Sequence, residues 1–198
     1  MRKLLVALVI IVSMGTTGVV CAQDFQKGVE AYNSGDYATA LKQWKVLAEQ
    51  GNAEAQFNLG VMYGKGEGVA QYYKDAVKWF HKAAEQGYAE AQGTLGGMYE
   101  LGLGVTQDYK KAVKWWRKAA QQGFAEAQFY LGMTYVKGLG ATQNLVTAHM
   151  WFSIAAANGA QEAAGVRELV ANKLSSSDLA KAQRMAKRRM NSNYKDRD

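Results

Sequence analysis

Residues 89–123 read AEAQGTLGGMYELGLGVTQDYKKAVKWWRKAAQQG, and the same pattern recurs before and after this stretch. At an offset of 36 residues, leucine, glycine, tyrosine and alanine positions of neighbouring stretches coincide. The aligned sets are Leu59, Leu95 and Leu131; Gly60, Gly96 and Gly132; Tyr63, Tyr99 and Tyr135; and Ala76, Ala112 and Ala148. A fixed period of this length is typical of an array of similar supersecondary units. The sequence therefore predicts three repeats, at 52–87, 88–123 and 124–159.

Each repeat carries the residue spacing of two helices joined by a glycine-rich turn. Intervals of three and four residues place the recurrent positions on one helix face. Gly64 to Gly68 suits the turn between the helices, and Gly87 suits the end of the second helix. Most of the 21 glycines stand at such points and Pro is absent, so we expect an all-α chain. In the repeat at 52–87, the recurrent face of the first helix consists of Ala53, Gln56, Leu59, Gly60 and Tyr63. That of the second helix consists of Ala76, Trp79, Phe80, Ala83 and Ala84.

A shorter repeat, residues 23–51, precedes these three and lacks their Gly-x-Gly insertion. Asp36, Asp108 and Asn144 stand where the second helix of a repeat begins. Each can accept a hydrogen bond from a backbone N–H of the first helical turn. Tyr72 occupies the equivalent position and is a poor cap, so we expect a less sharply defined helix start there.

In these residues the chain resembles the Sel1-like repeat family, which is related to tetratricopeptide repeats. The matching motifs are Ala-Glu-Ala-Gln, Leu-Gly-x-x-Tyr, Gly-x-Gly-Val, Asp-Tyr-x-Lys-Ala, Trp and Lys-Ala-Ala-x-x-Gly. Residues 89–123 carry them almost in full, whereas the neighbouring repeats depart from them at Tyr72 and at Ala141, Asn144 and Leu145. The resemblance implies a right-handed α-solenoid of helix-turn-helix repeats, and the residues after 160 are predicted to add a C-terminal capping helix. It also implies a protein-binding scaffold, often in export, envelope or host-contact settings.

The C-terminal part is predicted to close this array, because a solenoid must cover its last apolar face. Residues 160–190 are interpreted as capping helices, with Ser175 and Asp178 forming a capping box. The inner face of the last helix is predicted to hold Leu179, Ala182, Gln183, Met185 and Ala186. Residues 191–198 are predicted to be a basic disordered tail. From Lys181 onward the basic residues suit either a solvated helix end or contact with an anionic membrane.

The first 22 residues have the pattern of a secretory signal. A basic start at Arg2 and Lys3 precedes an apolar run, and small residues precede an expected cleavage after Ala22. The run is short for a membrane span. Cleavage would also remove Cys21, the one cysteine. We therefore expect a periplasmic or secreted protein; an uncleaved anchor and a lipoprotein modified on Cys21 are the alternatives.

Catalytic, cofactor and metal motifs are not evident in the sequence. Neither of the two histidines, His81 and His149, recurs at a matching position of another repeat, and the Gly-x-Gly pairs are interpreted as turns between helices. We therefore expect no enzyme activity, no cofactor and no metal. The alternative is an envelope enzyme of the β-lactam-binding branch of the family, but this chain lacks that branch's cysteines.

A partner is expected on the concave face formed by the first helices, where the repeats differ from one another. Its identity is open, although export disfavours nucleic acid. Gly93 and Gly97 are predicted to open a hollow between two aromatic ridges, with Lys65 and Lys137 meeting acidic flanks of a peptide. One ridge consists of Phe57 and Val61, and the other consists of Phe129, Tyr130 and Met133. The alternative is that the glycines have no such role and that Phe57 and Phe129 pack within the solenoid. The candidate residues are Phe57, Asn58, Val61, Lys65, Gly93, Thr94, Gly97, Leu101, Phe129, Tyr130, Met133 and Lys137.

Overall fold

The computed structural model describes residues 24–194 of the chain. The predicted signal segment, Cys21 and the last four residues lie outside the described part. The structure divides into two compact units, 1–79 and 80–198, and the division falls within one helix. Within residues 24–194, no helix combines the length and the apolar character needed to cross a membrane.

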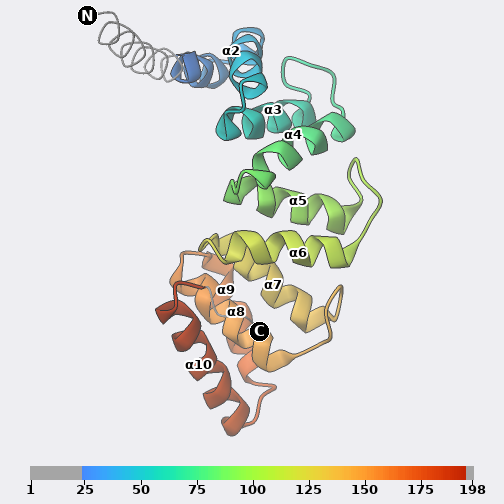
Figure 1. The fold of residues 1–198 in the computed structure, drawn as a ribbon. Coiled ribbons are helices and arrows are strands. Elements are labelled where there is room, and N and C mark those ends of the chain that lie inside the picture. Colours follow the sequence, from blue (N-terminus) through green and yellow to red (C-terminus); the bar gives the residue numbers. More distant parts are fainter. Residues whose placement is uncertain (1–23, 195–198) are drawn as a thin grey trace, which may run out of the picture. The chain divides into compact units, whose positions relative to one another are not determined.

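The regular elements of residues 24–194 are helices, which confirms the all-α prediction (Figure 1). Residues 24–33 are helical, and the labelled helices follow in chain order. They are α2 (Tyr37–Glu49), α3 (Ala53–Lys65), α4 (Tyr73–Glu85), α5 (Ala89–Leu101), α6 (Tyr109–Ala120), α7 (Ala125–Lys137), α8 (Leu145–Ala157), α9 (Gln161–Ala171) and α10 (Ser176–Asn191).

In the first unit, α2 and α3 pack around a small apolar core. Trp44 and Leu47 come from α2, and Leu59 and Met62 come from α3. The helix over residues 24–33 closes this core, with the Tyr32 ring centroid 5.4 Å from that of Trp44. The short first repeat therefore takes part in the fold through large aromatic side chains.

In the second unit, consecutive helices from α5 to α9 pack against one another in sequence order (Figure 1). The contact between the helices of a repeat depends on a large ring from the second helix lying over a glycine of the first. A Cβ atom added to Gly96 would overlap Trp116, and one added to Gly132 would lie 2.5 Å from Phe152. Glycine at these positions permits the close approach that buries both rings.

Buried glutamines link each repeat to the one before it. The Gln56 side chain donates to the carbonyl of Ala48 at 2.9 Å. Gln92 and Gln128 donate at 3.0 Å to Ala84 and Ala120, the equivalent carbonyls of later repeats. These carbonyls lie near helix C-termini, where backbone acceptors lack partners within the helix. The glutamine of Ala-Glu-Ala-Gln is thus a structural residue.

Three of the predicted helix starts have the expected side-chain caps. Asp36, Asp108 and Asn144 accept hydrogen bonds of 3.1, 3.0 and 2.9 Å from backbone N–H groups three residues ahead. At Tyr72, the backbone carbonyl accepts from the N–H of Ala76 at 3.1 Å as α4 begins.

The C-terminal helices α9 and α10 both pack against α8. Ser175 caps α10 as predicted: its hydroxyl accepts from the N–H of Asp178 at 3.1 Å and donates to the Asp178 carboxylate at 2.8 Å. Ala182 and Ala186 are buried as predicted, but Gln183 is exposed. Arg189, expected on the outer basic face, is only 5% exposed and lies 4.7 Å from the Trp151 ring centroid.

The segment after α10 differs from the predicted tail as far as residue 194. The chain turns at Asn193 and Tyr194, and the Tyr194 hydroxyl donates to the Asn158 side chain at 2.8 Å. Asn158 in turn donates to Gln128 at 2.8 Å. A disordered tail was expected because polar and basic residues predominate there, but this one tyrosine anchors the segment to the second unit.

Candidate partner-binding groove

Two neighbouring cavities lie along the first helices of the second unit. One, of about 310 Å³, lies between α5 and α7, and the other, of about 420 Å³, lies between α7 and the start of α9. They share Glu126 and Tyr130, so we treat them together and call them the first-helix groove. Its lining consists of Gly93, Thr94, Gly97, Glu100, Leu101, Phe124, Glu126, Ala127, Phe129, Tyr130, Gly159, Ala160, Gln161 and Glu162.

The α5 side of the groove is open at one of the two predicted glycines and filled at the other. A Cβ atom on Gly97 would meet nothing within 4 Å, and the neighbouring Leu101 is 66% exposed. A Cβ atom on Gly93 would lie 2.6 Å from the Phe124 ring. The Gly93 carbonyl also accepts a hydrogen bond of 3.2 Å from the Trp116 indole. Gly97 therefore leaves the hollow open, whereas Gly93 makes room for Phe124.

The α7 side of the groove presents Tyr130. This side chain is 44% exposed, and its ring stacks on Trp116 with centroids 5.2 Å apart and planes inclined by 12°. Phe129 supports it edge-on, at 5.7 Å. Because Trp116 is buried between helices, the Tyr130 ring is held in place before any partner arrives.

The predicted ridge on α7 is narrower than expected. Phe129 and Met133 pack against the core formed by Ala148, Phe152 and Val170. The ring centroids of Phe129 and Phe152 are 5.6 Å apart. Phe129 therefore packs within the fold, as the alternative interpretation stated, and reaches the groove with part of its surface.

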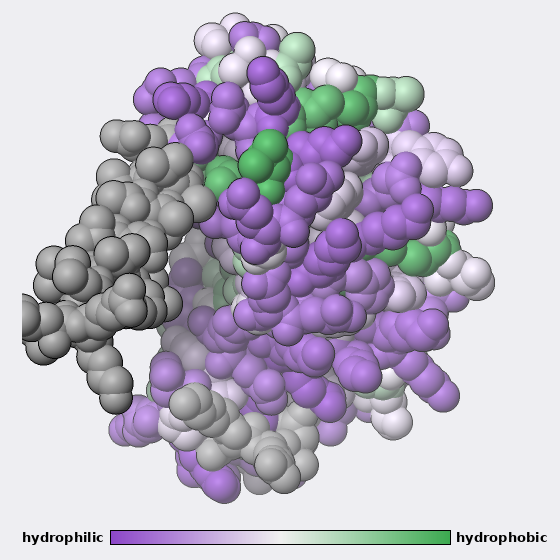
Figure 2. Space-filling model, turned by 45° about the horizontal axis from the view of Figure 1, so that its top comes forward, coloured by the Kyte–Doolittle hydropathy of each residue, from purple (hydrophilic) through white to green (hydrophobic). Residues whose placement is uncertain are grey.

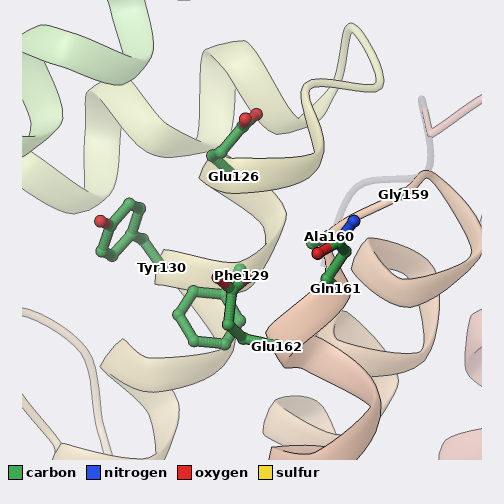
Figure 3. Close-up of a pocket in the computed structure, with 7 residues that line it drawn as sticks. All are labelled: Glu126, Phe129, Tyr130, Gly159, Ala160, Gln161 and Glu162. Carbon is green, nitrogen blue, oxygen red and sulfur yellow. The ribbon is translucent and has the colours of Figure 1, made fainter.

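The α9 side of the groove adds a carboxylate. In Figure 3, Glu126, Phe129 and Tyr130 project from α7, and Gln161 and Glu162 from the first turn of α9 opposite. Glu100 lines the α5 side. No Lys, Arg or His is among the described residues that line either cavity. The groove is therefore acidic in a chain whose formal net charge is +7.

The candidate residues of the first unit lie on α3. Phe57, Asn58 and Val61 are half-buried there. Lys65 is exposed, but it donates to the Tyr32 hydroxyl at 3.1 Å and lies 3.7 Å from the Glu67 carboxylate. The hydrogen bond from Lys65 to Tyr32 raises the pKa of Lys65. Lys65 thus has partners within its own unit. Lys137 ends α7 and is exposed.

Both histidines contact side chains of the packed helices. His81 lies 3.2 Å from the Tyr99 hydroxyl and edge-on to Trp115. His149 is buried, and the Ser153 hydroxyl lies 3.5 Å from its Nδ1 atom. That hydroxyl also donates to the His149 carbonyl at 2.9 Å, which is the usual bond of a serine within a helix. Among residues 24–194, no cluster of His, Cys, Asp or Glu could hold a metal ion.

Sequence reasoning missed the acidic character of the groove. Glu54, Glu90, Glu126 and Glu162 recur every 36 residues, each in the first turn of its helix. Acidic residues suit that position because of the helix dipole, so the recurrence by itself indicates a helix start. The packing of the repeats is needed to show that Glu126 and Glu162 line one cavity.

The packed helix pairs and the groove on their first helices define a helical-repeat scaffold. The family model of the Sel1 repeat matches residues 53–88, 89–124 and 125–159. These ranges make up more than half of the chain, and the chain belongs to the Sel1 repeat family. A comparison with curated proteins gives no match.

Two solved structures extend this result. A Sel1 repeat protein from Oxalobacter formigenes is 39% identical with a TM-score of 0.67, over 70% of this chain and 57% of that one. The protein c5321, a protective antigen present in uropathogenic Escherichia coli strains and displaying an SLR fold, is 29% identical with a TM-score of 0.62. That match covers 88% of this chain and 47% of c5321. The chain thus spans about half the length of the proteins it matches.

Proposed function

We propose that this protein is an exported, non-enzymatic scaffold that holds a protein partner in the first-helix groove. The observation that carries the proposal is the exposure of Leu101 on α5 and Tyr130 on α7, two side chains that line the same cavity as the open space at Gly97. A tyrosine held in this way is a typical anchor of protein–protein contacts, and the apolar surface of Leu101 beside it can be buried by a partner. The Sel1 repeat family, whose repeats generally mediate protein interactions, supports the same role.

Photo-crosslinking tests the location of the partner. A photoreactive amino acid would replace Leu101 in the groove, and in a matched control it would replace Leu169 on α9. Leu101 is 66% exposed and Leu169 is 65% exposed, but Leu169 does not line the groove. We expect a discrete protein adduct from position 101 in intact cells and none from position 169. Equal adducts from both positions, or none from position 101, would contradict the proposal.

Location in the bacterial cell envelope is part of the proposal and rests on the first 22 residues. N-terminal sequencing of the protein purified from its host tests it. A start at Gln23 is expected. A start at Met1 would contradict export by a cleaved signal, and a start at a lipid-modified Cys21 would identify an anchored form instead.

The surroundings of Ser153 support a non-enzymatic role. Its hydroxyl hydrogen is directed to the His149 carbonyl, whereas an activated serine donates to its general base. We expect no turnover of the chromogenic β-lactam nitrocefin by the purified protein. Turnover that survives further purification would favour the envelope-enzyme alternative.

Contact with an anionic membrane is a second candidate function, favoured by the exposed basic side chains of α10. Arg184, Lys187 and Arg188 line a shallow surface hollow there. Sedimentation with anionic lipid vesicles would measure binding of the protein and of a variant with Arg184→Glu and Lys187→Glu. The matched control is Lys42→Glu with Lys45→Glu, two exposed positions on α2. Loss of binding only in the α10 variant is the expected result, and equal binding by all three proteins would exclude this function.

A further inference from the structure

We infer that the first-helix groove binds a partner segment that carries a basic side chain next to an apolar one. The inference rests on the proposed function and names the chemistry of the partner. It reverses the expectation from sequence, in which Lys65 and Lys137 were to meet an acidic peptide. Three features of the groove support it: its charge, the face of Tyr130 and the space at Gly97.

The charge of the groove opposes that of the whole chain. The sequence has 24 Lys and Arg against 17 Asp and Glu, yet the described lining holds Glu100, Glu126 and Glu162 and no basic residue. None of the ion pairs found within residues 24–194 uses these three carboxylates. Complementary charge selects partners and steers their approach, so the groove favours a cation and disfavours an anion.

Tyr130 gives the cation a second contact. It lines both cavities beside Glu126, with its ring held against Trp116. A Lys or Arg side chain is attracted to the face of such a ring within about 6 Å of its centroid. The same protein uses this contact elsewhere: the Lys118 ammonium lies 4.4 Å from the Trp115 ring centroid. Glu126 and Tyr130 together therefore form the expected contact for the basic residue.

The α5 side of the groove accounts for the apolar neighbour. Gly97 leaves space beside Leu101 and Phe124 in the cavity that also contains Tyr130. An aliphatic or aromatic side chain placed there would bury apolar surface against Leu101. On the face drawn in Figure 2, hydrophilic side chains predominate and hydrophobic ones form separate small patches.

Selection of peptides gives the first test. Random heptapeptides displayed on phage would be selected against the full chain as purified, and against the same chain with Gly97→Leu, which fills the space. We expect Lys or Arg next to Leu, Ile or Phe in the enriched peptides, and loss of their binding to the Gly97→Leu variant. Peptides that need the open groove but lack a basic residue would overturn this inference and leave the proposed function standing. Binding unaffected by Gly97→Leu would overturn both.

A charge reversal with a matched control gives the second test. Glu126→Lys would be compared with Glu90→Lys, the same position one repeat earlier, which lines neither cavity. Both changes place Lys in the first turn of a helix, so their effects on folding cancel in the comparison. We expect fluorescence anisotropy to show about tenfold or more loss of affinity for a selected basic peptide with Glu126→Lys, and a change within roughly twofold with Glu90→Lys.

The neutral variant Glu126→Gln keeps the test informative if the reversal disturbs folding. It should weaken binding by a smaller factor while circular dichroism shows unchanged helicity. Affinity for the basic peptide should also fall as salt increases, because screening weakens exposed charge pairs. Unchanged affinity in both Glu126 variants with intact helices would contradict the inference.

Discussion

Glycines inside the first helices of this protein have two different physical roles. Gly132 lets the Phe152 ring approach the backbone of α7. Gly96 likewise lets the Trp116 ring approach the backbone of α5. Gly97 has no such neighbour, because an added Cβ atom would meet nothing within 4 Å. Glycine is unfavourable in a helix interior, so its presence at Gly97 costs stability without a packing gain.

Alanine substitutions at these two helical positions should therefore have opposite effects. Gly132→Ala is expected to lower the free energy of unfolding by about 1–3 kcal/mol, because the added methyl group displaces Phe152. Gly97→Ala should raise it by about 0.5–1 kcal/mol, since it improves helix propensity in open space. Urea unfolding followed by circular dichroism measures both. Equal destabilisation by the two changes would contradict the assignment of roles.

The two histidines predict a pH dependence of stability. Burial lowers the pKa of His81 and of His149, and Arg167 adds to the effect at His149. Because the pKa in the folded state lies below the unfolded value of about 6.5, the unfolded chain binds more protons as the pH falls below that value. Their full contribution to stability is therefore present above about pH 6.5 and decreases below it, by at most about 1.4 kcal/mol per pH unit for each histidine.

The urea concentration at the unfolding midpoint should accordingly decrease when the pH is lowered from about 7.5 to about 5.5. His149→Gln keeps a polar side chain of similar length and removes the titration, so this variant should show a shallower dependence. A slope identical to that of the unchanged protein would show that His149 does not carry the effect.

Among the helices, α10 shows how an element can close the last repeat. It packs on α8 through Ala182, Ala186 and Arg189. The guanidinium of Arg189 lies over the fully buried Trp151 ring, so a charged residue here completes an apolar face. An amphipathic interpretation places every arginine of such a helix in solvent, which is why the sequence predicted the wrong side for Arg189.

Truncating the Arg189 side chain should therefore lower the stability of the protein more than truncating the exposed side chain of Lys187. We expect Arg189→Ala to destabilise the protein by about 1–2 kcal/mol through lost packing on Trp151. Lys187→Ala, at an exposed position of the same helix, should change stability by less than about 0.5 kcal/mol. Thermal unfolding of both variants is the measurement, and similar losses would argue against a structural role for Arg189.

The starts of three helices could be predicted because the capping signal is local and recurs in the repeats. Asp36, Asp108 and Asn144 mark helix starts by their own side chains, whatever lies around them. The inner residues of α10 and the segment ending at Tyr194 occur once and lack a repeat for comparison. Their positions depend on Trp151 and Asn158, which the chain supplies from α8 and from the residue directly after it.

At the scale of the whole molecule, the helices of each unit contact neighbours that are close in sequence. In the second unit the helices from α5 to α9 each pack on the next, as expected of a repeat array, and α10 packs back on α8. Stability in such arrays is close to a sum of local terms, so a disturbance should spread only to neighbouring helices.

Hydrogen exchange of Gly132→Ala tests this locality. Faster exchange is expected in α7 and α8, which contact each other directly, and unchanged exchange in α2 and α3 of the first unit. A uniform increase over α2 to α10 would instead show that the described chain unfolds as one cooperative body.

The sequence by itself determined the repeat period, the all-α class and the helix starts, because period and capping depend on residues near one another in the chain. The tertiary structure alone decided which recurrent residues meet. Gly93 is filled and Gly97 is open because the Phe124 ring, from the next repeat, reaches one and not the other. Glu126 and Glu162 share a cavity with Tyr130 only after α7 and α9 have packed. The character of the groove is therefore a property of neighbouring repeats, which no single repeat contains.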